Sequence, residues 1–176
     1  TLLWKDWAAV VMDASGHWTD SRERPLVQPP DLPCNVGKGL REWRYDGEGN
    51  FVLEMDGGLP PVGWSHLLVN EDFGWITDET GCGHLWQKNS RENQITEWNN
   101  DPLAVGGPEW FVLELKGLRR SVFGDGEPIR VTYGLGWARW EKKWGEKTVR
   151  TTALIPWGAR GRMISVEVPG EKGTLL

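Results

Sequence analysis

The sequence predicts an all-β protein in which two antiparallel sheets pack face to face as a sandwich. Short apolar segments recur along the 176-residue chain and end at turn sequences, which is the pattern expected of a sandwich. Glycine and proline occur 23 and 11 times, so turns are frequent. No stretch of about ten residues with the periodicity of a helix follows a predicted strand, and this disfavours the βαβ units of a parallel sheet.

The first group of predicted strands consists of apolar runs that stop at turn residues. Residues 51–55, for example, end at Asp56-Gly57-Gly58, a strong turn sequence. In chain order, the predicted strands of this group are 51–55, 64–69, 73–77, 110–115 and 118–123. Residues 5–13 are also predicted as a strand, closed by a hairpin turn at 14–16, because their apolar residues do not follow a helical stripe.

The second group of predicted strands alternates between apolar and polar residues, the period of a strand with one buried face. The predicted buried faces are Ile129, Val131 and Tyr133; Val149, Thr151, Ala153 and Ile155; and Ile164, Val166 and Val168.

Two long polar segments do not fit a strand pattern. Residues 21–39 are rich in proline and are predicted to form a long surface connection. Residues 88–107 contain planar amides and charges beside Trp98, the side-chain chemistry that grips hydroxyl-rich ligands. Loops of this length inside a compact domain are usually functional or disordered.

The chain contains 13 tryptophans, against four phenylalanines and two tyrosines. Packing does not require this excess, because leucine and valine fill a core without an indole N–H to satisfy. An indole also presents a flat face to the C–H groups of a sugar ring. For any single tryptophan, a core position is nevertheless the more frequent use.

Charge and composition exclude several classes of function. The formal net charge is −5 with no basic stripe, which disfavours a dedicated nucleic-acid binder. No apolar run reaches the roughly 18 residues of a membrane span, and residues 1–7 lack an apolar signal core. Cys34 and Cys82 have no zinc-ligand spacing. They could form one disulfide, but reduced thiols are favoured, and we expect no metal and no cofactor.

Common catalytic motifs are absent from the sequence. The Gly-Lys-Gly at 37–39 lacks the spacing of a phosphate loop, and no Gly-x-Ser-x-Gly occurs. A glycosidase needs two carboxylates at a fixed separation across a sugar, which sequence cannot show. Solvated turn acids are the favoured interpretation of Asp72, Asp78, Glu79, Glu92, Glu97 and Asp101.

An ordered series of motifs runs through the middle of the chain. It comprises Pro-x-x-Trp at 61–64, Asn-x-x-Phe-Gly at 70–74, Thr-Gly-x-Gly-x-x-Trp at 80–86, and Asn-Ser-Arg-Glu-Asn followed by Thr-x-Trp-x-Asn-Asp-Pro at 89–102. Together with segments 131–140 and 152–156, this series resembles the N-terminal β-sandwich of the inverting glycoside phosphorylases. These enzymes form glycoside hydrolase family 94, formerly glycosyltransferase family 36. The family includes cellobiose, cellodextrin and chitobiose phosphorylases and related cyclic glucan synthases. The resemblance covers roughly residues 50–168.

The resemblance implies a supersandwich-like fold, here in a partial version, with residues 46–176 as the sandwich domain. Residues 1–45 match poorly and are expected to pack on it. Family members cleave β-glucosides with inorganic phosphate in the cytoplasm, and the catalytic and phosphate-binding residues belong to an (α/α)6 barrel. No catalytic residue therefore transfers to this chain. The expected partners are a β-glucan-type oligosaccharide, phosphate in the parent enzyme, the barrel, and a second copy in a homodimer.

The sandwich of the family helps to wall the active-site entrance and contributes dimer contacts. The resemblance carries this role to the polar loop from Asn89 to Asp101. The candidate carbohydrate-binding residues are Trp86, Asn89, Arg91, Glu92, Asn93, Trp98, Asn99 and Asp101.

Three hypotheses for the function remain open from the sequence. The first is a non-catalytic sandwich domain of a glycoside phosphorylase or related glucan-processing enzyme. The second is a freestanding carbohydrate-binding module that uses exposed tryptophans. The third is a structural assembly domain whose tryptophan-rich surface is an interface.

Overall fold

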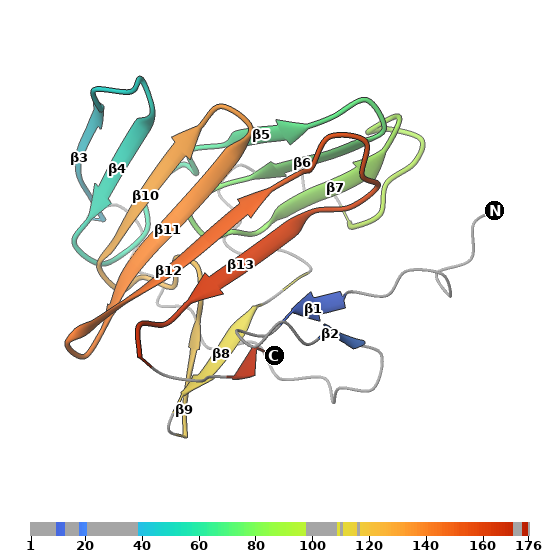
Figure 1. Ribbon diagram of the computed structural model, residues 1–176. Coiled ribbons are helices and arrows are strands. Elements are labelled where there is room, and N and C mark those ends of the chain that lie inside the picture. Colours follow the sequence, from blue (N-terminus) through green and yellow to red (C-terminus); the bar gives the residue numbers. More distant parts are fainter. Residues whose placement is uncertain are drawn as a thin grey trace.

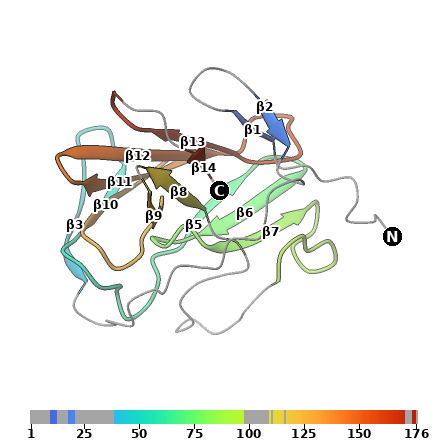
Figure 2. The ribbon, with the colours of Figure 1, turned by 90° about the horizontal axis from the view of Figure 1, so that it is seen from below.

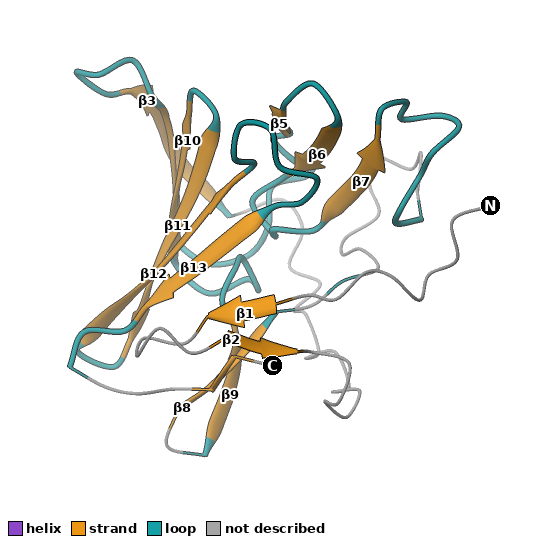
Figure 3. Cartoon of the chain, turned by 45° about the vertical axis from the view of Figure 1, so that its right-hand side comes forward, coloured by secondary structure: helices purple, strands orange, loops and turns teal. Residues whose placement is uncertain are grey.

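The computed structural model describes residues 10–12, 18–20, 39–97, 109, 111–115, 117–170 and 174–175. For residues 10–12, 18–20, 115 and 174–175 it describes the backbone alone. Within these ranges every regular element is a strand, and Figure 3 shows the described part of the chain as strands and loops only.

The strands are short and numerous. In chain order they are β1 (Val10–Met12), β2 (Trp18–Asp20), β3 (Leu40–Tyr45), β4 (Phe51–Met55), β5 (His66–Val69), β6 (Phe73–Thr77), β7 (Gly83–Gln87), β8 (Val112–Leu115), β9 (Leu118–Ser121), β10 (Ile129–Gly134), β11 (Trp137–Trp144), β12 (Lys147–Leu154), β13 (Met163–Glu167) and β14 (Thr174–Leu175).

Two sheets form the body of the molecule. The larger has six strands in the order β13-β12-β11-β10-β4-β3, and the smaller has three in the order β5-β6-β7. Seen from below, the two sheets form two layers (Figure 2). A further three-stranded sheet, β14-β8-β9, and the β1-β2 pair lie toward the lower end (Figure 1). All described pairings are antiparallel, and the predicted sandwich is confirmed.

Strands with a clear sequence pattern were predicted at or close to their observed positions. The predictions for 51–55 and 73–77 coincide with β4 and β6. β12 buries the three predicted residues within its bounds, and β10 buries its whole predicted face. In β13 the predicted face is only half-buried, because β13 is the last strand of the large sheet.

Other predicted strands begin late or end early. β5 starts at His66 rather than at residue 64, because the backbone N–H of Trp64 bonds the Glu79 carboxylate at 2.9 Å. β9 ends at Ser121, whose hydroxyl accepts the N–H of Phe123 at 3.1 Å and turns the chain. β8 begins at Val112; the predicted start at residue 110 lies outside the described residues.

The pattern missed five described strands, namely β2, β3, β7, β11 and β14. In β11, buried residues alternate with half-buried or exposed ones, but Lys142 occupies one of the inner positions and interrupts the apolar pattern of that face. β3 pairs with β4, which adds residues 40–45 to the large sheet; the proposed division of the chain at residue 45 stays a prediction. Of the predicted 5–13 strand, the structure describes β1, which pairs with β2. The proposed turn at 14–16 lies outside the described residues, as does all of 21–39 except the buried Gly39.

The core lies between the two sheets and is dominated by aromatic rings. Trp75 of β6 and Trp140 of β11 are fully buried, with ring centroids 6.4 Å apart. Phe123 packs edge-on against Trp140 at 4.7 Å. Since large rings bury more apolar area than aliphatic side chains, these three rings tie the small sheet to the large one.

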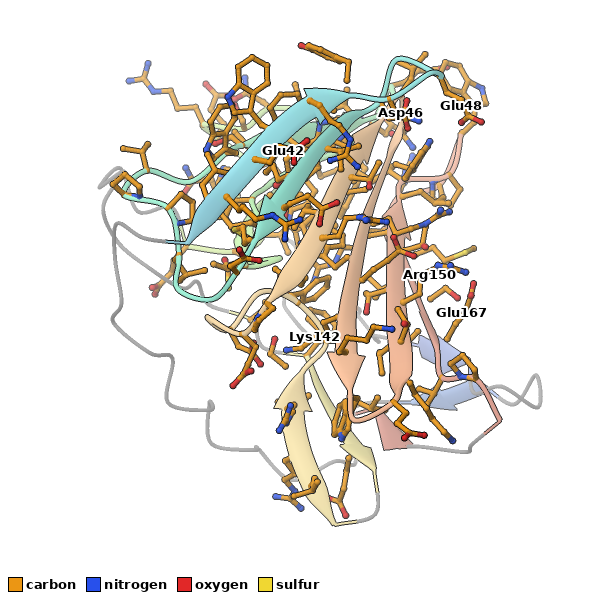
Figure 4. The ribbon with its side chains drawn as sticks, turned by 90° about the vertical axis from the view of Figure 1, so that its left-hand side faces the viewer. Glu42, Asp46, Glu48, Lys142, Arg150 and Glu167 are labelled. Atoms are coloured by element: carbon orange, nitrogen blue, oxygen red, sulfur yellow. The ribbon has the colours of Figure 1, made fainter. Side chains whose placement is uncertain are left out.

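The outer face of the large sheet is a ladder of charges. One row across the six strands reads Glu42, Glu54, Arg130, Glu141, Arg150 and Glu167. Arg130 reaches Glu54 at 2.6 Å, and Arg150 reaches Glu141 at 3.0 Å. Figure 4 shows Arg150 and Glu167 side by side on this face and Glu42 at the far strand. Glu54 is buried beneath its arginine partners, whereas the ion pair between Arg150 and Glu167 is exposed and contributes little stability.

Lys142 is a charged residue in the interior. Its side chain is 1% exposed, and its Nζ bonds Asp125 Oδ2 at 2.5 Å and the carbonyl oxygens of Ser121 and Phe123 at 3.1 and 3.4 Å. Burial lowers the pKa of Lys142, while Asp125 opposes this change. The ammonium group therefore fastens the segment after β9 to β11.

We predict that Lys142→Ala lowers the free energy of unfolding by about 3 kcal/mol or more, because it leaves the Asp125 carboxylate without its buried partner. Lys143→Ala is the matched control: Lys143 is exposed and its Nζ donates to the hydroxyl of Thr148 at 2.9 Å, so its loss should cost less than about 0.5 kcal/mol. Urea unfolding of both variants measures the difference. Equal losses would contradict the fastening role of Lys142.

Candidate functional site

The polar loop after β7 lies on the surface. Lys88 takes a left-handed backbone conformation with φ 60°, which redirects the chain where β7 ends. Arg91, Glu92 and Asn93 are exposed, so their side chains are accessible to a ligand. The candidate residues Trp98, Asn99 and Asp101 lie outside the described residues.

Asn89 shapes the loop from within. Its Oδ1 accepts the backbone N–H groups of Arg91 at 2.9 Å and Glu92 at 3.1 Å. Its backbone carbonyl accepts the N–H of Asn93 at 3.0 Å, and the carbonyl of Asn93 accepts the N–H of Gln87 at 3.0 Å. This is the side-chain turn typical of asparagine, and it presents the next residues outward.

Trp86 lies flat on the neighbouring strand. A Cβ at Gly74, its cross-strand partner, would lie 2.2 Å from the indole ring, so the glycine is required for this contact. The ring also stacks on His84, with centroids 5.4 Å apart. Trp86 is half-buried and therefore both packs the small sheet and shows part of its ring beside the loop.

The loop folds back onto β7. Thr96 is buried, and its hydroxyl accepts the N–H of Leu85 at 2.9 Å. The N–H of Ile95 bonds the carbonyl of Leu85 at 2.8 Å, and Gln94 forms an isolated bridge with Trp86. These bonds hold residues 91–94 in a fixed place at the edge of the small sheet. The structure thus places five of the candidate residues at the end of β7 and in the loop that follows it, namely Trp86, Asn89, Arg91, Glu92 and Asn93. Their role in binding remains a prediction.

Of the acids interpreted from sequence as solvated, Glu79 is buried, and for this residue the interpretation was wrong; its neighbour Asp78 is half-buried. Glu79 is 2% exposed. Its Oε2 accepts the N–H of Trp64 at 2.9 Å, and its backbone carbonyl accepts Trp140 Nε1 and the N–H of Gly124, each at 3.0 Å. Asp78 accepts the N–H of Thr80 at 2.8 Å and also the Thr80 hydroxyl. Sequence reasoning missed this because tertiary packing, not the turn itself, buries Glu79.

The surroundings of Asp78 and Glu79 raise the pKa of both carboxyl groups. Burial raises the pKa of Glu79 to about 7, and the neighbouring Asp78 charge adds to the rise. Burial also raises the pKa of Asp78. Nearby, His66 stacks on Tyr133 with centroids 4.7 Å apart, and burial lowers the pKa of His66. Burial and the two acids raise the pKa of Tyr133.

A second group of aromatic rings lies at the edge of the large sheet. Trp43 and Tyr45 project from β3 and are 54% and 67% exposed. They contact Phe51, which stacks on Trp64 with centroids 5.2 Å apart. The sequence contained a signal for this group: in the β3 sequence LREWRY, aromatic residues two apart alternate with charged ones, the period of a strand.

The fold and the site define the class of protein: an antiparallel β-sandwich that carries a polar loop held by backbone hydrogen bonds at the edge of its small sheet. Residues 51–173 match the family described as "Glycosyl hydrolase 94, supersandwich domain", and the chain belongs to that family. The resemblance seen in the motifs is therefore confirmed.

The chain is also similar to a much longer protein. Over 85 residues it is 36% identical to the cyclic beta-(1,2)-glucan synthase NdvB of Rhizobium meliloti (strain 1021). The match covers 48% of this chain and 3% of that protein, so the chain spans a small part of the curated relative's length. Within the described residues, no helix is long and apolar enough to cross a membrane, and no group of three or more potential metal ligands occurs.

We predict that the pH dependence of stability reveals the buried state of Glu79. Because the pKa of Glu79 is raised from 4.5 to about 7 on folding, the folded chain holds a proton that the unfolded chain releases. This contribution is present below pH 4.5 and is lost as the pH rises through about 7, with a magnitude of roughly 3 kcal/mol at most.

Urea unfolding at a series of pH values, in parallel with Glu79→Gln, measures this effect. The wild type should lose stability relative to Glu79→Gln between about pH 5 and about pH 8. The comparison cancels much of the opposite trend from His66, whose lowered pKa makes stability rise with pH. A constant difference between the two proteins across this range would contradict the assignment.

Proposed function

We propose that this chain is a non-catalytic, carbohydrate-associated sandwich domain of a glucan-processing enzyme, whose bond-breaking chemistry resides in another domain. The observation that carries the proposal is that the two acids with a raised pKa, Asp78 and Glu79, serve as acceptors of structural hydrogen bonds. The carboxylate of Glu79 accepts the N–H of Trp64, its backbone carbonyl accepts the indole N–H of Trp140 in the large sheet, and Asp78 closes the turn by accepting the N–H of Thr80, so both acids with a raised pKa have structural partners. General acid catalysis requires a carboxyl group within hydrogen-bond reach of the substrate, and Glu79 is enclosed by the fold.

In this proposal, the rigid loop carrying Arg91, Glu92 and Asn93 lines the entrance to an active site on an (α/α)6 barrel. The parent enzyme acts in the cytoplasm on β-linked gluco-oligosaccharides and inorganic phosphate, and the sandwich contributes to the contacts of a homodimer. Membership of the family and the exposure of the loop support this role. The name of the relative supports a β-glucan as the ligand class.

A second candidate is a carbohydrate-binding module that works without a barrel. One described aromatic surface favours it, since Trp43 and Tyr45 of β3 are 54% and 67% exposed. Exposed aromatic patches mark interaction sites, so a structural assembly surface would use the same residues. Binding of sugar by the isolated chain distinguishes the module from an assembly domain.

We predict that the 176-residue chain releases no sugar phosphate from cellobiose, laminaribiose, sophorose or chitobiose in the presence of phosphate. The physical reason is that the two described acids whose pKa is raised by burial, Asp78 and Glu79, have structural hydrogen-bond partners, and Glu79 is 2% exposed. A coupled assay for glucose 1-phosphate and glucosamine 1-phosphate derivatives measures the result. A clear release that Glu79→Gln abolishes would place catalysis in this chain and contradict the proposal.

A further inference from the structure

We propose that the aromatic edge, defined as Trp43, Tyr45, Phe51 and Trp64, binds the pyranose rings of a neutral β-linked glucan by stacking. This inference rests on the proposed function and names a surface for its ligand that is distinct from the loop after β7. The argument combines the placement of the four rings, their mutual orientation, the groove beside them and the charges around them.

The sheet geometry explains why these rings are exposed. Trp43 is paired with Leu53, and Tyr45 with Phe51, so both point to the side of the large sheet that carries the core. In the centre of that side Trp140 is completely buried. β3 is the last strand of the sheet, at the left of Figure 1, away from β7. The small sheet therefore leaves the rings of β3 more than half exposed.

Two of the rings, Phe51 and Trp64, are stacked, and Trp43 is tilted against both. The planes of Trp43 and Phe51 differ by 31°, those of Trp43 and Trp64 by 34°, and those of Phe51 and Trp64 by 25°. Their centroids lie 5.2 to 6.4 Å apart. Rings at these separations support one another, and the exposed Trp43 extends the stack to the surface. A flat aromatic face of this kind matches the C–H face of a pyranose ring.

A groove continues from the aromatic edge. It has a volume of about 490 Å³ and is lined by Leu40 and residues 60–65, so Trp64 belongs to both the groove and the ring cluster. This volume lies within the range of small-ligand sites, roughly 300–1,000 Å³. The groove is open to solvent, which suits an extended chain of sugars better than a single enclosed one.

The aromatic edge is held in place before any ligand binds. Pro60 and Pro61 restrict the backbone of the groove wall, and the carboxylate of Glu79 fixes the N–H of Trp64. On the other side, Asp46 closes the β3–β4 hairpin by accepting the N–H groups of Glu48 and Asn50, each at 2.9 Å. Pre-organisation of this kind lowers the ordering cost of binding.

The charges around the edge favour a neutral ligand. Residues 60–65 carry no charge. The charged residues of β3 are engaged in ion pairs: Arg41 with Asp56 at 3.2 Å, and Arg44 with Glu54 at 3.3 Å and Glu42 at 3.4 Å. An acidic polymer or a nucleic acid would need unpaired cations, whereas a glucan needs flat apolar faces with hydroxyl partners at the rim, such as the exposed Ser65.

The test is calorimetric titration of the 176-residue chain with a linear β-1,2-linked gluco-oligosaccharide. We expect saturable binding that Trp43→Ala and Tyr45→Ala each weaken at least about tenfold, as removal of a central aromatic contact does at other interfaces. Trp157→Ala is the matched control, because Trp157 is 81% exposed and belongs to a different loop; it should leave the affinity unchanged. Trp43→Phe should retain most of the binding, and circular dichroism checks that each variant is folded.

Three results would overturn the inference. The first is binding that Trp43→Ala and Tyr45→Ala leave intact but Arg91→Ala removes, which would place the glucan on the loop and leave the proposed function standing. The second is absence of binding with self-association that Trp43→Ala abolishes, which would make the edge a protein interface. The third is absence of both binding and self-association. Failure of the proposed function itself is seen separately, as sugar phosphate released by this chain.

Discussion

The structure depends on one interior contact, in which the buried indole of Trp140 meets the turn after β6. An indole N–H enclosed in an apolar core needs an acceptor, and the carbonyl of Glu79 supplies it at 3.0 Å. The N–H of Gly124 reaches the same carbonyl. A Cβ at Gly124 would lie 2.4 Å from that oxygen, so only glycine allows the approach. Three segments distant in sequence are thereby joined at one atom.

This junction organises the surfaces on which function is proposed. The side chain of Glu79 turns from the junction to the N–H of Trp64 and so sets one wall of the groove. On the other side of the small sheet, β7 runs from the same turn to the rigid loop that Asn89 shapes. Acids with a raised pKa are often catalytic. Here the carboxylate of Glu79 bonds the backbone N–H of Trp64, a structural use that is consistent with the non-catalytic role proposed for this chain.

Sequence predicted those elements whose own residues carry the information. β4 and β6 are apolar runs between turns, and β12 alternates strictly, so local pattern and tertiary burial agree. β11 escaped prediction because the buried Lys142 finds its partners in the segment after β9, which no local pattern reveals. The exposure of Arg91 follows from its polar loop. The aromatic edge and the burial of Glu79 depend on which strands face each other, and that is a property of the whole fold.

The central claim is that the bond from Trp140 to Glu79 lies at the centre of a core shared by both sheets. Exchange of the indole N–H protons with deuterium, followed by NMR, tests it residue by residue. The account predicts that Trp140 exchanges only when the whole domain unfolds, with a protection free energy equal to that of global unfolding, whereas the 81% exposed Trp157 exchanges at once. If Trp140 exchanged as fast as Trp157, the two sheets would not share this core, and the account would be contradicted.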